Sequence, residues 1–422
     1  MIPRPGYSFP ESSCASDFFS ILFSWRRIFF CLFTAFSLYY HRRFFFSTGV
    51  FREDSMHNFF DYLFWRGDIS FASSPFNEVD SLLLCLISYL DYSGIVDPDF
   101  STEGTPFSLV AQKMRSLPDF EARHDLGKVI NAATMDVMLR AAETERFGNL
   151  RLSAYVNILD PGREEQFSAV TFSNPGEWSA VIYRGTDSTV VGWKEDFNLG
   201  CMDTVPAQKD ALSYLEKAGE SLPGKLIVSG HSKGGNLALY ASSHCKSGFK
   251  SRIISVYNND GPGFKKEFFS SQDFLSIKDR VHTFVPELSI VGMLFSHPDE
   301  YQVVKSDEKG VMQHDPFSWH VGPRHFEVVP ETSHSSKVIG ESINTWIQDL
   351  SAEQRELFIE TIFGVLKDAD ITKNSQLASN PLETIPRLIS ATKKLDQATK
   401  TAVFKTVHLL VKTTVETFSR NS

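Results

Sequence analysis

The segment Leu226–Gly235, LIVSGHSKGG, constrains the fold more than any other part of the chain. An apolar run with the length of a buried strand leads directly into Gly-x-Ser-x-Gly, and a helical pattern follows over Gly235–His244. A serine at such a strand-to-helix turn sits in strained backbone, so Gly230 and Gly234 around it are needed to let strand and helix approach. The pattern predicts that Ser232 is a nucleophile at an elbow. The alternative is a glycine-rich turn with an incidental serine.

Strand and helix patterns alternate on both sides of this turn. Strands are expected at 225–229, 253–257, 281–285 and 301–305, with helices at 207–218, 235–244 and 264–274. Such alternation implies βαβ units and an α/β fold with a largely parallel central sheet flanked by helices. Upstream, a meander of strands is expected at 151–157, 166–172 and 179–183, with turns at Asp160-Pro161-Gly162 and Asn174-Pro175-Gly176.

Helical additions are expected at both ends of this α/β region. The apolar periodicity predicts helices at 79–92, 107–117, 129–142, 337–350, 352–367 and roughly 388–418. Ser351 and Gln354 form a capping-box pattern at the start of one of them. We therefore divide the chain into an N-terminal extension (1–55), an α/β domain (56–335) and a C-terminal helical region (336–422).

Residues 1–55 differ in character from the rest. Two apolar pieces, 18–25 and 28–40, are separated by Arg26 and Arg27, and each is shorter than the roughly 20 residues needed to cross a bilayer. Three interpretations are open. Residues 18–40 make membrane contact, the segment is a disordered or loosely helical tail, or it is not native and the protein starts at Met56, which is the expectation we favour.

Composition excludes some classes of function. The formal net charge is −9, which argues against a nucleic-acid partner because such proteins carry a basic footprint. The five cysteines are scattered without a Cys-x-x-Cys pair, so neither a disulfide framework nor a zinc site is indicated. This cysteine usage fits a reducing compartment. We expect a cytoplasmic protein, with membrane association as the alternative.

A serine nucleophile needs a histidine base, which follows the acid in the chain order Ser, acid, His. Active groups in α/β sheets gather beyond the carboxyl ends of the strands. His314 lies in the loop after the strand 301–305, in GVMQHDPFSW, and is the preferred base. His297, just before that strand, is the alternative, and His314 would otherwise be a loop residue that caps the turn at Asp315-Pro316.

Two carboxylates are candidates for the acid. Asp260 follows the strand 253–257, in NNDGPG, and Glu287 follows the next strand, in FVPE. Spacing does not separate them. Asp260 is preferred because a shorter side chain in a loop braced by glycine and proline is better fixed. The alternative role for Asp260 is a turn-former that bonds within its own loop.

The oxyanion formed on attack must meet preorganised N–H donors. The backbone N–H of Lys233, directly after the nucleophile, is one candidate. Thr186, which could offer both its N–H and its hydroxyl, is the other, because Tyr183-Arg184-Gly185-Thr186 follows the strand 179–183 and Gly185 permits close approach of the backbone. The alternative for this segment is a simple turn.

With these residues placed, the chain resembles the class 3 lipase-like branch of the α/β hydrolases, whose W-x-x-D-hydrophobic stretch is similar to Trp193 with Asp196-Phe197. More closely, it resembles the Mbeg-like family of bacterial proteins, from about residue 58 to the helices past 360. The motifs that carry this resemblance are WRGDISF, YRGTD, GHSKGGNLA, NDGPGF, SIVGM and QHDPFSW. The resemblance implies an α/β-hydrolase fold and hydrolytic chemistry but no particular substrate. Class 3 lipases usually have aspartate where this chain has Glu287, and leucine where it has Lys233.

The expected function is therefore that of a serine hydrolase of the esterase or lipase type, acting on a small-molecule or lipid ester. No metal or organic cofactor is implied. The alternative is a non-catalytic α/β-hydrolase-like binding or scaffold protein. Convergence of Ser232, His314 and a carboxylate would favour the enzyme.

Overall fold

The computed structural model describes residues 57–124, 131–200, 202–297, 300–308, 310–372, 381–403 and 405–406. The chain divides into two compact units, Met1–Val50 and Phe51–Ser422, and all described residues belong to the second. The expectations for residues 1–55 fall outside the described residues. No helix in the described part of the chain is both long enough and apolar enough to span a bilayer.

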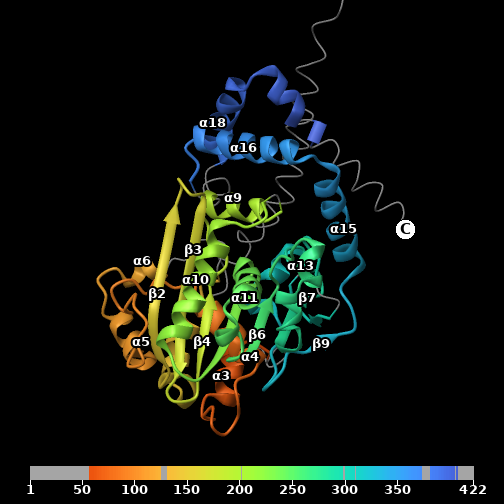
Figure 1. The fold of residues 1–422 in the computed structure, drawn as a ribbon. Coiled ribbons are helices and arrows are strands. Elements are labelled where there is room, and N and C mark those ends of the chain that lie inside the picture. Colours follow the sequence, from red (N-terminus) through yellow and green to blue (C-terminus); the bar gives the residue numbers. More distant parts are fainter. Residues whose placement is uncertain are drawn as a thin grey trace, which may run out of the picture. The chain divides into compact units, whose positions relative to one another are not determined.

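Nine strands form one sheet within the described residues, and they lie side by side in sequence order (Figure 1). The strands are β1 (Thr105–Pro106), β2 (Arg151–Asp160), β3 (Glu165–Asn174), β4 (Trp178–Tyr183), β5 (Lys225–His231), β6 (Ile253–Asn259), β7 (Val281–Pro286), β8 (Gln302–Val304) and β9 (Val328–Val329). Strands β4 to β8 run parallel, whereas β1 to β4 and the pair β8–β9 are antiparallel.

This mixed sheet corrects the expectation of a largely parallel one. The meander expected upstream is present, and it joins the same sheet as the parallel strands. Only short turns connect β2, β3 and β4, and connections of that length can join antiparallel neighbours only. Helices connect β4 to β5 and β5 to β6, which permits the parallel crossovers.

Helices cover both faces of the sheet. Before β2 come α3 (Phe59–Arg66), α4 (Glu78–Ile87), α5 (Phe107–Arg115), α6 (Phe120–His124), α7 (Thr134–Ala142) and α8 (Glu145–Gly148). Between the strands lie α9 (Val190–Asn198), α10 (Pro206–Ser221), α11 (Lys233–His244), α12 (Ser247–Lys250), α13 (Lys266–Ser270) and α14 (Gln272–Leu275). Side chains alternate along β4, so Ala180 and Ile182 pack with α4 and α7, while Val181 and Tyr183 pack with α10 and α11.

The C-terminal helices are α15 (His334–Asp349), α16 (Ala352–Asp368) and α18 (Pro381–Lys394). Most helix and strand predictions are confirmed, with ends shifted by a few residues, and the capping box of Ser351 and Gln354 is present. The single helix expected over 388–418 is wrong within the described residues. The helix ends at Lys394 and a new one begins at 397, because Asp396 accepts a hydrogen bond from the N–H of Thr399 and caps the second helix.

Helix α16 packs on α9 through an apolar and a charged contact. The rings of Phe197 and Phe363 meet edge to face, with centroids 5.8 Å apart. Lys194 Nζ lies 2.7 Å from a carboxylate oxygen of Glu360. These contacts matter for the site because α9 also carries two carboxylates, the buried Glu195 and the half-buried Asp196, which are described below.

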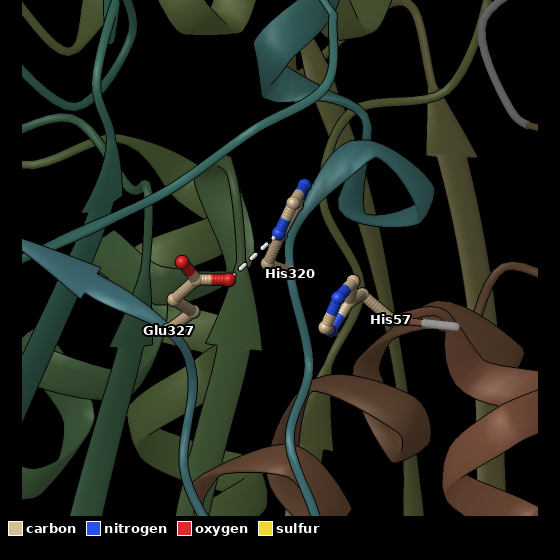
Figure 2. Close-up of side chains that lie close together, drawn as sticks. All are labelled: His57, His320 and Glu327. Carbon is tan, nitrogen blue, oxygen red and sulfur yellow. Dashed lines mark hydrogen bonds and ion pairs between the residues drawn. The ribbon is translucent and has the colours of Figure 1, made fainter. Parts of the chain in front are cut away.

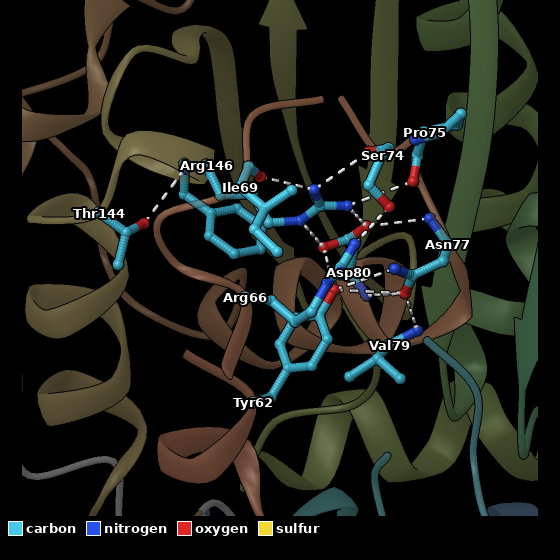
Figure 3. A network of polar contacts seen from close by, with 11 residues as sticks. Tyr62, Arg66, Ile69, Ser74, Pro75, Asn77, Val79, Asp80, Thr144 and Arg146 are labelled. Carbon is cyan, nitrogen blue, oxygen red and sulfur yellow. Dashed lines mark hydrogen bonds and ion pairs between the residues drawn. The ribbon is translucent and has the colours of Figure 1, made fainter. Parts of the chain in front are cut away.

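A buried ion pair joins the helices that precede the sheet (Figure 3). Arg146 in α8 donates from Nε to Asp80 Oδ1 (2.7 Å) and from its terminal nitrogens to Asp80 Oδ2 and to the carbonyl oxygens of Ile69, Ser74 and Pro75. Asp80 is fully buried in the first turn of α4 and also accepts from the Tyr62 hydroxyl of α3 (2.6 Å). The pair therefore joins three helices, α3, α4 and α8, and both of its charged side chains are shielded from solvent.

Replacing Arg146 with methionine should lower the free energy of unfolding by about 3–5 kcal/mol, because it leaves the Asp80 carboxylate buried without its cation. Urea titration with an unchanged m-value measures this loss. The matched control is Arg115→Ala, since Arg115 pairs with Glu143 on the surface, and it should cost no more than about 1 kcal/mol. Equal losses in the two variants would contradict the role given to the buried pair.

Candidate active site

Ser232 occupies a strained turn between β5 and α11. Its φ is 57° and its ψ is −134°, a conformation that side-chain-bearing residues rarely adopt. A Cβ on Gly230 would lie 2.0 Å from the carbonyl of Gly234, and one on Gly234 would lie 2.1 Å from the Tyr183 oxygen. Only glycine fits at either position. The turn is also held by the N–H of Ser232, which donates to the carbonyl of Asn259 (2.9 Å).

His314 and Asp260 form a close pair. Nδ1 of His314 lies 2.6 Å from Oδ2 of Asp260, whose side chain is completely buried. The other carboxylate oxygen, Oδ1, accepts from the hydroxyl of Ser289 (2.5 Å) and the N–H of Gly292 (3.1 Å). Both oxygens of the buried carboxylate are therefore hydrogen-bonded, and the imidazole ring is oriented by one of them.

His231 brings His314 next to the elbow. The two imidazole rings have centroids 4.6 Å apart, and Nε2 of His231 lies 3.0 Å from the carbonyl oxygen of His314. Burial, with a smaller contribution from His314, holds the pKa of His231 well below its usual range, so this ring is neutral. Its Nε2–H therefore donates to His314, which leaves Nδ1 to accept from the Tyr89 hydroxyl (3.3 Å).

Neither alternative residue takes part in this pair. Glu287 accepts a hydrogen bond from the N–H of Ser306 (3.4 Å). Burial lowers the pKa of His297 to about 4, and its Nε2 has no hydrogen-bond partner among the described atoms. Of the two carboxylates and two histidines considered for the acid and the base, the structure pairs Asp260 with His314.

The segment after β4 abuts Ser232. A Cβ on Gly185 would lie 2.9 Å from Ser232 Cβ and 2.1 Å from the Tyr89 hydroxyl, so the backbone approaches Ser232 as closely as glycine allows. The next residue, Thr186, donates its hydroxyl proton to Asp196 Oδ1 (2.7 Å). That proton is committed, which leaves the backbone N–H of Thr186 as the group able to face an oxyanion.

Lys233 points into the protein interior. Its Nζ donates to Glu195 Oε2 (2.8 Å) and to the backbone and side-chain oxygens of Gln166 (2.6 and 2.8 Å), and both charged side chains are fully buried. Glu195 also accepts from the N–H groups of Gln166 and Ala207. The lysine is therefore a tether between the start of α11, strand β3 and helix α9.

Two adjacent carboxylates of α9 thus support the two candidate oxyanion donors. Glu195 holds Lys233 and Asp196 holds Thr186. Burial raises the pKa of Asp196 to about 6, and the nearby Lys233 cation opposes that rise. Asp196 was singled out in the sequence only through the family resemblance. The sequence did not predict roles for Glu195 and His231. Their contacts are with residues distant in the sequence, and no local motif reveals such contacts.

One group of side chains has the composition of a metal site (Figure 2). The ligand atoms of His57, His320 and Glu327 all lie within 4.8 Å of one another. Both ring nitrogens of His320 face carboxylates, Glu327 at 2.9 Å and Asp307 at 2.6 Å, and Lys305 pairs with the other oxygen of Glu327 at 2.8 Å. The group is therefore satisfied as an ion-pair network, and the absence of a metal requirement stays a prediction.

Comparison with known proteins gives one family. The family model described as Mbeg1-like matches residues 141–364, which is more than half of the chain. No curated protein sequence matches the chain.

Several solved lipase structures are similar to part of the chain. M37 lipase is 16% identical with a TM-score of 0.33, over 52% of this chain and 70% of that one. Rhizomucor miehei lipase in its propeptide complex is 18% identical with a TM-score of 0.31, over 45% of this chain and 64%, less than two thirds, of that one. A fungal lipase–inhibitor complex is 15% identical with a TM-score of 0.33, over 55% of this chain and 86% of that one.

Replacing Lys233 with methionine should lower the free energy of unfolding by about 3–5 kcal/mol, because Glu195 is left buried and charged. The double variant Lys233→Met/Glu195→Gln should lose less, since no unpaired charge remains. Chemical denaturation of the single and double variants measures the difference. Identical losses would show that the lysine contributes by packing alone.

The raised pKa of Asp196 predicts a specific pH dependence of stability. Because the folded-state pKa of about 6 exceeds the ordinary value of 3.8, its contribution is fully present below about pH 4 and is lost as the pH rises through 6. The difference in unfolding free energy between the wild type and Asp196→Asn should therefore fall by up to about 3 kcal/mol from pH 4 to pH 7. A difference that does not vary with pH would contradict the shift.

Proposed function

The chain belongs to the Mbeg1-like family, and we propose that it is a serine hydrolase of the esterase or lipase type. Ser232 is the nucleophile, His314 the base and Asp260 the acid. The observation that carries this proposal is the 2.6 Å contact between His314 Nδ1 and Asp260 Oδ2, next to the strained turn of Ser232. The substrate class is an ester of a small molecule or a lipid.

The order of the elements supports an α/β-hydrolase fold. The nucleophile follows β5, the acid follows β6, and the histidine follows β8. These strands run parallel, so their carboxyl ends meet at one edge of the sheet, where groups from different strands converge. The chain order Ser, acid, His is that of α/β hydrolases.

The geometry supports the following proton and bond changes. Because Nδ1–H of His314 donates to Asp260, Nε2 is the free acceptor and takes the proton of Ser232 Oγ. The oxygen attacks the ester carbonyl carbon, and the π electrons move to the carbonyl oxygen. The imidazolium that forms is stabilised by the Asp260 carboxylate. Collapse of the intermediate breaks the ester C–O bond, and the alcohol leaves with the proton from His314.

The intermediate's negative oxygen is stabilised by the N–H groups of Lys233 and Thr186. Lys233 is the first residue of α11, and N–H groups in a helix's first turn have no partner within the helix. The tethers to Glu195 and Asp196 fix both residues before the substrate binds. A water molecule, activated by His314 in the same way as the serine, then hydrolyses the acyl-enzyme and restores Ser232.

Treatment of the full chain with a fluorophosphonate probe tests the proposal. We expect covalent labelling of the wild type at Ser232, identified by peptide mapping, and no labelling of Ser232→Ala at unchanged thermal stability. A folded wild-type protein that does not label would contradict the proposal. It would favour the non-catalytic binding or scaffold protein instead.

A matched pair of variants tests the choice of acid. Asp260→Asn should reduce kcat for a short p-nitrophenyl ester by about 10³–10⁴, since the imidazolium loses its anion and the ring its orientation. Glu287→Gln should leave kcat within about twofold, because the hydrogen bond that this side chain accepts within the described residues comes from the N–H of Ser306. A larger effect at Glu287 than at Asp260 would reverse the assignment.

A further inference from the structure

We infer that helix α15 positions the catalytic acid, by holding the loop of residues 288–296 that orients Asp260. We call this segment the acid loop. The effect on catalysis rests on the function proposed above. The hydrogen bonds between α15 and the acid loop, which we call the clamp, are a property of the fold.

The first link runs from Asp260 through Ser289 to α15. Ser289 donates its hydroxyl to Asp260 Oδ1, and its own carbonyl oxygen accepts a hydrogen bond from the hydroxyl of Ser336. Ser289 is 1% exposed and Ser336 is fully buried, so water does not compete for either bond. Gly292 makes the second contact to Oδ1, where an added Cβ would lie only 2.1 Å away.

The second link is Asn344, two turns further along α15. Its Oδ1 accepts from the N–H of Phe295 (2.6 Å), and its Nδ2 donates to the carbonyl oxygens of Met293 and Phe295 (both 3.2 Å). Phe295 has a φ of 65°, a left-handed conformation that is strained for a bulky residue. Such strain persists only where the surroundings impose it, and the Asn344 amide supplies three of the hydrogen bonds that do so.

One face of α15 packs against the acid loop. Ser336, Gly340 and Asn344 are spaced by four residues and therefore lie along the same side of the helix. A Cβ on Gly340 would lie 3.0 Å from Met293 Cβ, so a glycine here lets the helix reach the loop backbone. Three consecutive positions on that side thus contact the acid loop.

This arrangement makes α15 a positioning element. A carboxylate that orients a catalytic imidazole has to be held closely, and a misplacement of 1 Å can cost about 10² in rate. Release of the acid loop should lower kcat and leave KM nearly unchanged, because none of these residues is assigned to substrate binding. Anything that shifts α15 would change turnover through Asp260.

The test compares variants of the full chain that loosen the clamp with one that does not. Asn344→Leu and Ser336→Ala should lower kcat for a short p-nitrophenyl ester, and the rate of fluorophosphonate labelling, by about 10- to 100-fold. Ser336→Thr keeps the hydroxyl and should restore most of the rate. The matched control is Ser342→Ala, since Ser342 is also buried in α15 but, in the part of the chain that the structure describes, its hydroxyl donates to the carbonyl oxygen of Val338 in its own helix.

Hydrogen exchange of peptides covering 288–296 tests the clamp independently of catalysis. Exchange should be faster in Asn344→Leu and Ser336→Ala than in the wild type, and unchanged in Ser342→Ala. If the fluorophosphonate does not label the wild type but the variants show this exchange pattern, the proposed function is rejected and the clamp is retained. The inference would be overturned if exchange is unchanged in both loosened variants, or if both keep the kcat of the wild type. If Asn344→Leu does not fold, the same comparison is made with Ser336→Ala alone.

Discussion

The buried carboxylate of Asp260 is the group on which the arrangement of this site depends. A carboxylate without exposed surface is costly unless its oxygens are fully hydrogen-bonded. Here one oxygen meets the imidazole of His314, and the other meets the hydroxyl of Ser289 and the N–H of Gly292. Those donors come from two loops that follow different strands, so satisfying one buried group also assembles the edge of the sheet.

A second buried carboxylate lies beside the elbow of Ser232, and it too is stabilised by a polar partner. Glu195 is as deeply buried as Asp260, but it is balanced by a cation, the ammonium group of Lys233. Its neighbour Asp196 has no such direct partner, and burial raises its pKa. One short helix thus carries two carboxylates in unequal electrostatic environments.

Periodicity in the sequence was sufficient to locate most helices and strands, because apolar residues recur at intervals set by the helix and the strand. The elbow at Ser232 was equally visible, since the contact that requires a glycine at position 230 is with Gly234, only four residues further along the chain. Asp260 and Glu287 could not be separated, because both directly follow strands. In the structure they are distinguished by the acid loop, which contacts Asp260 and is held by α15. One of the contacts that hold it, between Asn344 and Phe295, joins residues 49 positions apart and leaves no local pattern in the sequence.

The mixed character of the sheet shows a similar limit. Strand positions can be read from alternation, but whether a meander joins a parallel sheet depends on the pairing of β4 with β5, which a long crossover separates. The tether between Lys233 and Glu195 is also remote in sequence, because the partners lie 38 positions apart. Buried ion pairs of this kind are recognised only when the fold brings them together.

The two outermost strands of the sheet have a consequence for how copies of the protein behave toward one another. Strands β1 and β9 are each only two residues long. Next to β1, strand β2 is interrupted by a bulge at 153–156, and backbone oxygens of Asp97 and Asp99 accept the N–H groups of Tyr155 and Ala154. A short or bulged border offers little template for a strand from another molecule. The nine-stranded sheet is therefore protected at both borders against edge-to-edge aggregation.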